Sequence, residues 1–481
     1  MDAIATAFSG AAQQVRLLAS GAITAPELLE LYLGRIARLD DQLNTFRTVR
    51  LAGARSEAVD AQRRLDAGER LPLLGVPVAI KDDVDVAGEH TAWGTALHGP
   101  PKVHDAEVVR RLRVAGAVVI GKTNVPELTI WPFTDSPTFG ATRNPWDPSR
   151  SPGGSSGGTA AAVAAGLAPF GLGSDGGGSI RTPATWCGLY GMKPQRGRVP
   201  LAPHDDGWEG LIVNGPITRT VEDAALFLDV TTTLPAPEGG FVVAASRTPA
   251  RLRIAISAKS PLGVVARVGK AQRNAVTEAG ALLRALGHDI DERAPDYAAM
   301  SAGWNVTARY LRGIHDDVAT LGHPELLERR TRSMARAGAR ISDRRIAAVR
   351  AAEAALALRV NAIFDDVNVL LTPGTAVGPP RVGASRRRGA FLTASATMGR
   401  SPFQAIFNAT GQPAAVVPWG LDAAGLPTSV QLVGRPSDEA TLLALSAQIE
   451  SARPWAHRRP PSPEPSGWFS GRVARSEIRS R

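Results

Sequence analysis

The feature that most constrains this chain is a stretch rich in glycine, serine and proline between residues 136 and 200. Its densest segments are residues 151–158 (SPGGSSGG) and 173–181 (GSDGGGSIR). Glycine runs can adopt positive φ and let the backbone approach a ligand without a Cβ in the way. Successive N–H groups in such turns form a concavity that holds an anion. Beside Ser179, those donors suit the oxyanion that forms when a hydroxyl attacks an acyl carbon.

A serine hydroxyl is a weak nucleophile, so a site of this kind also needs a base. Lys81 ends the apolar run 76–80, and a strand built from that run could carry it into a poorly hydrated interior. Burial disfavours the charged form of a lysine and lowers its pKa. Lowering that pKa from about 10.4 to about 7 costs roughly 4–5 kcal/mol. The pattern fits a solvent-exposed strand end equally well, so at this point Lys81 is only a candidate.

Two familiar motifs also match this region, but their context argues against both. Residues 153–157 satisfy G-x-S-x-G, yet that nucleophile elbow needs a preceding strand, and residues 144–152 contain three prolines. Residues 171–176 satisfy G-x-G-x-x-G, but Pro183 interrupts the expected helix and Arg196 stands where a dinucleotide site has an acidic residue. The eight histidines are scattered without an H-E-x-x-H pattern. We therefore expect neither an elbow, nor a dinucleotide site, nor a metal site.

The rest of the chain alternates apolar strand-like runs with helical patterns. The runs lie at 76–80, 117–120, 367–371, 414–417 and 429–433, and the helical patterns at 24–39, 52–67, 105–114, 221–232, 269–286 and 343–365. Such alternation is typical of α/β architecture with buried strands. No linker divides the chain convincingly. We predict one large domain over residues 1–453, with an N-terminal helical segment of about residues 1–70 packed on it.

Composition narrows the class of protein further. The 481 residues are 44% hydrophobic, which is typical of a globular protein with a sizeable core. The single cysteine, Cys187, excludes a disulfide framework and a Cys-based zinc site, and it is expected to be a small buried filler. Residues 1–20 lack a secretory pattern, and the longest apolar stretch, 159–173, is too short to span a bilayer. These observations predict a soluble, cytoplasmic protein without a membrane partner.

The net charge of +10 raises the question of a nucleic-acid partner. Half of that excess lies in residues 451–481, which hold seven arginines, two acidic residues and several prolines. We expect residues 454–481 to form a basic, disordered tail. Arginine outnumbers lysine 49 to six throughout the chain, a bias that points to genome composition rather than to a binding code. Nucleic acid is therefore not the expected partner.

Taken together, the glycine-rich segments and their flanks resemble the amidase signature family. Residues 75–82, 153–158, 175–181 and 188–194 match its motifs in order, and so do residues 121–124, 144–146, 371–373, 408–413 and 431–434. The resemblance runs from about residue 20 to residue 452. It implies a mixed β-sheet covered by helices on both faces. It also implies a stand-alone bacterial-type amidase that needs no cofactor and hydrolyses a small-molecule amide.

The resemblance also implies a Ser–Ser–Lys triad. Ser179 would be the nucleophile, and Ser155 the bridging serine, held in this family by a cis peptide bond. Lys81, neutral at rest, would be the general base acting through Ser155, in preference to Lys122. A bridging hydroxyl can accept from one group while donating to another, and it can later return a proton to the departing amine.

Other residues receive supporting roles from the same resemblance. Gly176, Gly177 and Gly178, with the Ser179 N–H, would form the oxyanion hole. Asp175 and Arg181 would be a structural pair that fixes this loop, and Ser156 would be a supporting residue. A helix starting near Thr159 would place its N-terminal dipole close to the site.

Two alternative functions remain at this point. One branch of the family is the glutamine-hydrolysing component of a tRNA-dependent amidotransferase, which works with partner subunits. That branch tends to carry an aspartate about seven residues before the asparagine at position 408, where this chain has Ser401, so the stand-alone amidase is preferred. The remote alternative is a catalytically inactive nucleic-acid-binding protein, against which the filled triad argues.

The substrate pocket is expected to come from the variable segments 124–140 and 300–340. Trp131 and Phe133 are candidates for its lining, although core packing is the more common role of such residues. Residues 303–304 and 310–311 add apolar surface, which favours aryl or medium-sized acyl groups over charged ones. The physiological substrate and the oligomeric state are left open, a homodimer being one alternative.

Overall fold

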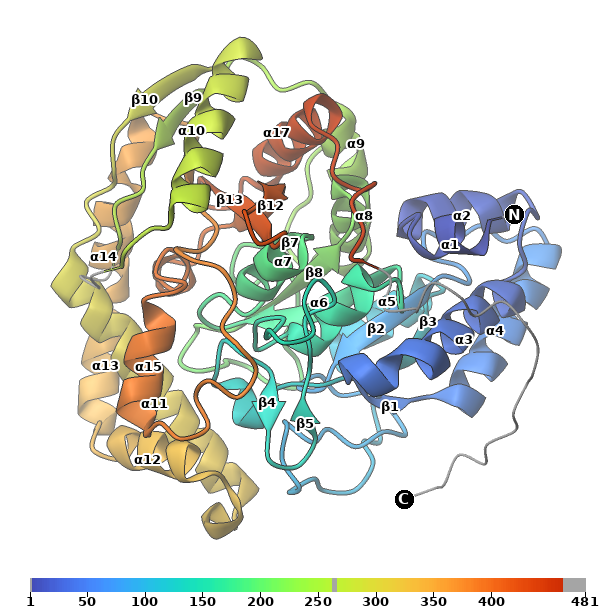
Figure 1. Cartoon of the computed structure of the whole chain (residues 1–481), viewed down its shortest axis with the longest axis horizontal. Coiled ribbons are helices and arrows are strands. Elements are labelled where there is room, and N and C mark those ends of the chain that lie inside the picture. The colour runs from blue at the N-terminus through green and yellow to red at the C-terminus, as the bar shows by residue number, and fades with distance from the viewer. Residues whose placement is uncertain (1, 262–265, 462–481) are drawn as a thin grey trace.

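The computed structural model describes residues 2–261 and 266–461 (Figure 1). Eleven strands form one sheet in the order β1-β3-β2-β6-β8-β7-β12-β13-β11-β9-β10, and β4 and β5 form a separate pair. Parallel and antiparallel neighbours are mixed, as the family resemblance implied. The strands are β1 (Phe46–Val49), β2 (Pro77–Lys81), β3 (Val118–Thr123), β4 (Asp135–Ser136), β5 (Gly140–Ala141), β6 (Phe170–Asp175), β7 (Tyr190–Lys193), β8 (Val213–Thr218), β9 (Arg253–Ile256), β10 (Asp289–Glu292), β11 (Val369–Pro373), β12 (Ala414–Leu421) and β13 (Pro427–Gly434).

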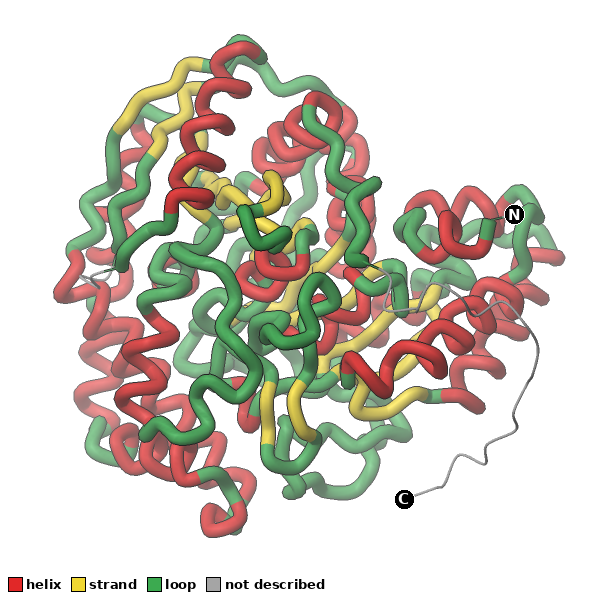
Figure 2. Tube along the Cα trace, in the orientation of Figure 1, coloured by secondary structure: helices red, strands yellow, loops and turns green. Residues whose placement is uncertain are grey.

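Helices cover the sheet on both faces, as Figure 2 shows by the red coils around the yellow strands. One layer contains α6 and α7, which pack together, and another contains α8, α9 and α17. The helices are α1 (Ala3–Ala7), α2 (Ala11–Ala19), α3 (Ala25–Leu43), α4 (Leu51–Asp66), α5 (Glu107–Val114), α6 (Gly157–Ala164), α7 (Arg181–Cys187), α8 (Val221–Thr231), α9 (Gly240–Ser246), α10 (Lys270–Ala285), α11 (Ala299–Leu321), α12 (Arg329–Gly338), α13 (Asp343–Ala351), α14 (Glu353–Asn361), α15 (Ala390–Met398), α16 (Ile406–Ala409) and α17 (Glu439–Ala452). The α/β fold class predicted from the sequence is confirmed.

The parallel trio β3-β2-β6 positions the candidate base. All residues of β2, β3 and β6 are buried, which is typical of parallel strands covered on both faces. Ile80 of β2 pairs with Leu172 of β6, so the two strands end at the same edge of the sheet. Lys81 and Asp175, the last residues of these strands, therefore reach the same region of the molecule.

Glycines in β6 and α6 allow this helix to lie unusually close to the sheet. A Cβ on Gly171 would collide with Thr159 of α6, and a Cβ on Gly158 would lie 2.5 Å from the backbone of Asn124. The G-x-G part of the motif noted in the sequence thus serves helix–strand packing. Residues 144–152, before the G-x-S-x-G match, contain no strand, in agreement with the sequence-based case against an elbow.

Several sequence-based element predictions hold in detail. The helical pattern at 24–39 corresponds to helix α3, which begins at a capping box formed by Thr24 and Glu27 and buries Leu28, Tyr32, Ile36 and Leu39. The helix predicted over 343–365 is instead divided into α13, α14 and a 3-10 turn at Ala362–Asp365. Strands β6 and β7 were not predicted, because residues 136–200 were interpreted only as rich in glycine, serine and proline, and β8, which follows that stretch, was not predicted either.

Residues 454–461 of the predicted tail are described, and part of this segment packs against the body. Trp455 is 2% exposed and its Nε1–H donates to the Arg219 carbonyl at 2.9 Å. The Arg459 guanidinium lies 4.7 Å above the Phe8 ring. Residues 462–481, which hold the remainder of the predicted tail, lie outside the described residues. Over 2–261 and 266–461, no helix has both the length and the apolar character needed to cross a membrane.

Candidate active site

Lys81 lies at the centre of a buried cluster of hydroxyl and carboxyl groups. Its side chain is fully buried, and its Nζ lies 2.8 Å from Ser155 Oγ and 2.6 Å from Ser174 Oγ. Asp83 Oδ2 lies 3.1 Å from the same Nζ and accepts a 2.5 Å hydrogen bond from Ser174 Oγ. The structure therefore brings two of the three predicted triad residues into direct contact.

Two opposing effects set the protonation of Lys81. Burial lowers its pKa below the ordinary value, while the negative charges of Asp83 and Asp175 oppose that shift. Burial is the larger effect, so the pKa of Lys81 is lowered overall. A lysine in this environment can act as a proton acceptor more readily than one in water.

Ser155 reaches Lys81 from an unusual backbone geometry. The Gly154–Ser155 peptide bond is cis, as the family resemblance implied. The neighbouring Ser156 holds this loop against β6, since its Oγ donates to the Ser174 carbonyl at 3.1 Å and accepts from the Ser174 N–H at 3.3 Å. The Ser156 N–H also donates to the Ser179 carbonyl at 3.1 Å. Ser156 thus connects the two glycine-rich loops.

Ser179 lies on the loop between β6 and α7, at the wall of a cavity. It is partly exposed. Within the described part of the chain, its hydroxyl has no hydrogen-bond partner, so the contact with Ser155 that a relay requires is not made here. Catalytic hydrogen bonds are often loose without substrate and tighten in the complex.

The three consecutive glycines differ in what their N–H groups do. The Gly178 N–H donates to Asp175 Oδ1 at 2.6 Å and is therefore already occupied. The N–H groups of Gly176, Gly177 and Ser179 have no acceptor among the described residues, and all three residues line the cavity. Gly178 has φ of 122°, and a Cβ there would overlap Gln404. The loop therefore leaves three N–H groups available to a ligand.

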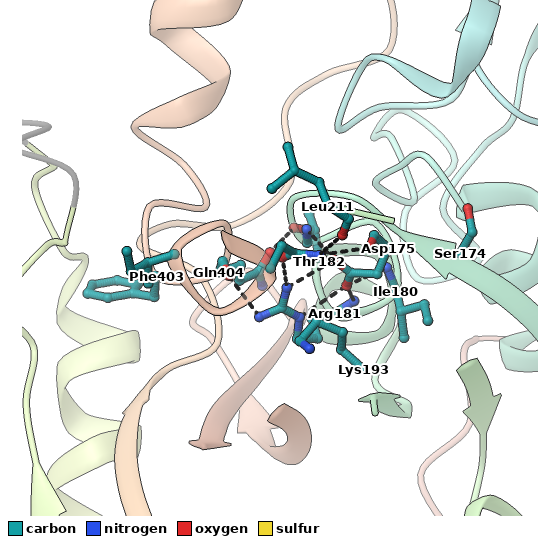
Figure 3. Close-up of polar contacts among 12 residues, drawn as sticks. Ser174, Asp175, Ile180, Arg181, Thr182, Lys193, Leu211, Phe403 and Gln404 are labelled. Atoms are coloured by element: carbon teal, nitrogen blue, oxygen red, sulfur yellow. Dashed lines mark hydrogen bonds and ion pairs between the residues drawn. The ribbon is translucent and has the colours of Figure 1, made fainter. Parts of the chain in front are cut away.

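Asp175 and Arg181 form a fully buried ion pair below this loop, visible in Figure 3. Arg181 Nη2 lies 2.9 Å from Asp175 Oδ1, and Arg181 Nε donates to Oδ2 at 3.0 Å. Burial alone would raise the pKa of Asp175, but Arg181 and the surrounding hydrogen bonds hold it well below its usual range. The same carboxylate accepts from the Gly178 and Ile180 N–H groups, so the pair fixes the loop that carries Ser179.

Sequence reasoning missed several partners of these residues. Arg181 also donates to Asn408 Oδ1 at 2.6 Å, to the Gln404 carbonyl at 3.1 Å and to Gln431 Oε1 at 3.0 Å. Residues 408 and 431 fall in matched family segments, which was the available signal. Ser174 and Asp83 flank matched residues in the same way, but nothing in the sequence shows that both contact Lys81.

The cavity beside Ser179 has a volume of about 690 Å³ and an uncharged lining. No residue of that lining, all of it within the described chain, is acidic, basic or histidine. The predicted segments 124–140 and 300–340 both contribute, and residues 389–405 form a third wall that the sequence did not predict. Trp131, Tyr310 and Leu311 line the cavity. Phe133 stacks on Trp131 outside it, with 5.8 Å between ring centroids.

Three further residues, two lysines and the cysteine, are buried at positions away from Ser155. Lys122 is buried and pairs with Asp82 at 3.0 Å, while its Nζ donates to Thr91 Oγ1 at 2.7 Å. Burial raises the pKa of the Cys187 thiol, which lies in the core. Lys193, which the sequence did not single out, is buried and donates to the Pro194 carbonyl, and burial lowers its pKa strongly. Neither Lys122 nor Lys193 is among the residues that contact Ser155.

Comparison with known proteins identifies the class. The family model described as Amidase matches residues 27–443. The chain therefore belongs to the amidase signature family and is an enzyme that hydrolyses amides.

Individual relatives agree with this assignment. A Mycobacterium tuberculosis protein named "Putative amidase AmiB2" is 64% identical over 460 residues, covering 96% of this chain and 99% of that protein. A structure of 6-aminohexanoate cyclic dimer hydrolase superposes with a TM-score of 0.85 at 30% identity, covering 94% of this chain and 99% of the other. A bacterial aryl acylamidase of the amidase signature family gives a TM-score of 0.81 at 27% identity, covering 93% of this chain and 96% of the other.

Proposed function

We propose that this amidase works through an acyl-enzyme on Ser179, with Lys81 as general base acting through Ser155. The observation that carries the proposal is the 2.8 Å contact between Ser155 Oγ and the Nζ of a fully buried lysine. Burial lowers the pKa of Lys81, which supports a neutral amine at rest. Ser179 lies at the cavity wall, where a substrate carbonyl can reach it.

The proposed reaction requires the hydrogen bond between Ser155 and Ser179 to form in the substrate complex. Lys81 accepts the Ser155 proton while Ser155 accepts the Ser179 proton, and Ser179 Oγ attacks the amide carbon. Collapse of the tetrahedral intermediate breaks the C–N bond, and the proton returns through Ser155 to the departing amine. Water then attacks the acyl ester by the same relay, which releases the acid and restores Ser179.

The N–H groups of Gly176, Gly177 and Ser179 form the oxyanion hole in this proposal. Each lines the cavity without an acceptor of its own among the described residues. Preorganised donors aimed at developing charge contribute about 2.7–4 kcal/mol each in comparable sites. The role of Gly178 differs from that of the other two glycines. Its N–H binds Asp175, and its positive φ shapes the turn.

The substrate class follows from the chemistry of the cavity. A lining without charged side chains suits an amide with an uncharged, apolar acyl group. The Trp131 side chain lines this cavity and adds apolar surface for such a group. Glutamine as substrate would bring an ammonium and a carboxylate into this cavity without charged partners, which is costly.

The uncharged lining therefore weighs against the glutamine-hydrolysing amidotransferase component. The cavity wall holds Ser401 where that branch tends to carry an aspartate. The inactive nucleic-acid-binding alternative conflicts with membership of an amide-hydrolysing family, and the charge-rich end of its supporting tail lies outside the described residues. A stand-alone amidase acting on apolar amides is the function we propose.

The test is covalent labelling with a fluorophosphonate, in which the serine oxygen displaces fluoride from phosphorus. We expect intact-mass analysis to show one adduct on wild type and none on Ser179→Ala, which should also lose amide hydrolysis. Ser301→Ala, which removes an exposed hydroxyl from α11, is the matched control and should label normally. Labelling of folded Ser179→Ala at the wild-type rate would refute the nucleophile.

The substrate class is tested with the same preparation. Anilides and alkyl amides of increasing acyl length should be hydrolysed with higher kcat/KM than glutamine. A preference for glutamine would overturn the proposed class and favour the amidotransferase alternative.

A further inference from the structure

One wall of the cavity beside Ser179 is a short segment with an uncommon backbone. Residues 129–132 line the cavity, and the 3-10 turn Glu127–Thr129 leads into them. Leu128 has a φ of 49° and Thr129 a φ of 57°. A positive φ is unfavourable for a residue with a Cβ, and most of all for a β-branched one. Such a backbone persists only where the surrounding structure enforces it. We call residues 127–132 the wall segment.

Two helices hold the wall segment beyond this turn. The Tyr310 hydroxyl of α11 donates a hydrogen bond to the Ile130 carbonyl. The Arg330 guanidinium of α12 lies 5.5 Å from the centroid of the Trp131 ring. Both helices also line the cavity, so the wall segment packs against the elements that form the neighbouring wall.

Glu127 makes the contact that joins the turn itself to α12. Its side chain is buried, with the residue 2% exposed, and its Oε1 accepts from the Glu328 N–H at 2.8 Å. Glu328 directly precedes α12, which contributes Ser333, Met334 and Ala337 to the cavity. Glu127 therefore connects two walls of the same cavity.

The surroundings of Glu127 affect its protonation. Burial raises the pKa of Glu127 to about 7, although the Glu328 N–H lowers it. The charged groups that act on it are the Glu328 carboxylate, which raises the pKa, and the Arg330 guanidinium, which lowers it. These two side chains pair with each other, with 2.9 Å between Arg330 Nε and Glu328 Oε2, so their charges partly cancel at Glu127.

We propose that Glu127 is a positioning residue whose carboxyl group fastens the wall segment to α12 and so fixes the shape of the cavity. Glu127 is not among the residues that line the cavity, so it acts through Thr129, Ile130 and Trp131, which are. Its effect on substrate binding rests on the proposed function, which places the substrate in this cavity. The attachment of the wall segment does not depend on that function.

The first experiment separates KM from kcat with butyranilide as substrate. Glu127→Ala removes the acceptor for the Glu328 N–H and allows the turn to relax. We expect KM to rise at least tenfold and kcat to change less than threefold, because Lys81, Ser155 and Ser179 lie outside the wall segment. Glu127→Gln keeps an acceptor and should restore KM to within threefold of wild type. A folded Glu127→Ala variant with the wild-type KM would overturn the proposal.

Glu450 of α17 provides a matched control. Its Oε2 accepts from the Val221 N–H at the start of α8, at 3.1 Å, and burial raises its pKa to about 7 as well. Neither α8 nor α17 contributes a residue to the cavity. Glu450→Gln should therefore keep the wild-type KM. A rise in KM equal to that of Glu127→Ala would show that the effect does not come from the wall segment.

The second experiment measures hydrogen exchange of the wall segment, which requires no substrate. Opening that brings Glu127 into water returns its pKa from about 7 to its ordinary value of 4.5. Protonation therefore favours the attached wall. The opening constant should rise by up to about tenfold per pH unit between pH 4.5 and pH 7 and level off above pH 7. We expect at least a tenfold rise between pH 5 and pH 7 after correction for the intrinsic exchange rate.

The glutamine variants decide the role of the Glu127 proton. In Glu127→Gln the opening constant should be independent of pH, because the amide does not titrate in this range. Glu450→Gln should keep the wild-type pH dependence. The same pH dependence in Glu127→Gln as in wild type would overturn the proposal, even if Glu127→Ala does not fold.

These outcomes are separate from those for the proposed function. Hydrogen exchange needs neither turnover nor the nucleophile. Failure of Ser179 to label with a fluorophosphonate would refute the nucleophile and leave the measured attachment of the wall segment standing. Normal labelling together with pH-independent opening in wild type would refute the role of Glu127 alone.

Discussion

At the scale of single residues, Lys81 is subject to desolvation and to a neighbouring carboxylate at once. Its burial favours the neutral amine, and Asp83 at 3.1 Å favours the ammonium. Each unit of pKa corresponds to about 1.36 kcal/mol, so the balance between these effects decides at which pH Lys81 can serve as the proposed base. Activity should rise with pH as Lys81 loses its proton.

Removing the carboxylate tests this balance. Asp83→Asn deletes the negative charge that stabilises protonated Lys81, so the pKa of Lys81 should fall further. We expect the acid limb of kcat/KM to move to lower pH. The measurement is kcat/KM against pH for wild type and variant. A shift to higher pH would show that Asp83 does not act on the base through its charge.

Two adjacent glycines, Gly177 and Gly178, allow a matched test of how the loop that carries Ser179 tolerates a side chain. A Cβ on Gly178 would overlap Gln404 and require an unfavourable φ of 122°, whereas the nearest atom to a Cβ on Gly177 is Ala405 Cβ at 3.7 Å. Gly178→Ala should lower kcat at least a hundredfold by displacing the loop that carries Ser179. Gly177→Ala should keep kcat within about tenfold. Steady-state kinetics of both variants, with circular dichroism as a folding check, decide the question; equal losses would contradict the steric explanation.

At the scale of elements, the Asp175–Arg181 pair connects parts of the chain that are far apart in sequence. Arg181 at the start of α7 pairs with Asp175 at the end of β6 (Figure 3). It also donates to Asn408 in α16 and to Gln431 in β13. Asn408 donates in turn to the Asp175 carbonyl at 2.7 Å. The loop that carries Ser179 is therefore positioned by three other elements, which explains why its geometry depends on the assembled sheet.

Breaking this pair should be costly. Arg181→Gln leaves the buried Asp175 carboxylate without its counter-ion, a loss of about 3–5 kcal/mol in the free energy of unfolding. Because the folded-state pKa of Asp175 lies below its unfolded value, the pair stabilises above the unfolded pKa and loses that effect as pH falls. Chemical denaturation of wild type and variant at pH 7 and at pH 3, which lies below the unfolded value of 3.8, measures both effects. The Asp175→Asn/Arg181→Gln double variant should lose less than the sum of the two single changes.

At the scale of the whole molecule, segments near the two ends of the described chain meet beside α8. Trp455 contacts Arg219, and Arg219 in turn donates to the Ala456 carbonyl at 2.9 Å and lies over the ring of Phe8. Residues just beyond α17 thus secure the N-terminal helices, although their sequence was interpreted as the start of a tail.

Two truncated chains test whether residues 454–461 stabilise the fold. A chain ending at residue 453 loses buried Trp455, whereas one ending at residue 461 keeps it. Removing a buried tryptophan costs about 3–5 kcal/mol, so the shorter chain should unfold at clearly lower temperature. Both chains lack residues 462–481, so that segment cannot cause the difference. Calorimetric scans with the same Tm for both chains would show that residues 454–461 do not contribute to stability.

The sequence by itself determined the elements whose pattern is local. The sequence alone is enough to recognise the apolar runs of β2 and β3, the capping box of α3 and the glycine-rich loops around Ser155 and Ser179. Tertiary structure decided the rest. Glycines in β6 have weak strand propensity and form a strand only because neighbouring strands and α6 pack against them.

The candidate site, too, was predicted only in part from the sequence. Family motifs pointed to Lys81, Ser155 and Ser179, but only the folded sheet shows that Lys81 is desolvated and contacts Asp83 and Ser174. The third wall of the cavity beside Ser179, residues 389–405, comes from a segment distant in sequence from the other two. Residue type and spacing specify which groups are present; burial, which sets their charge and their accessible partners, exists only after the distant segments pack.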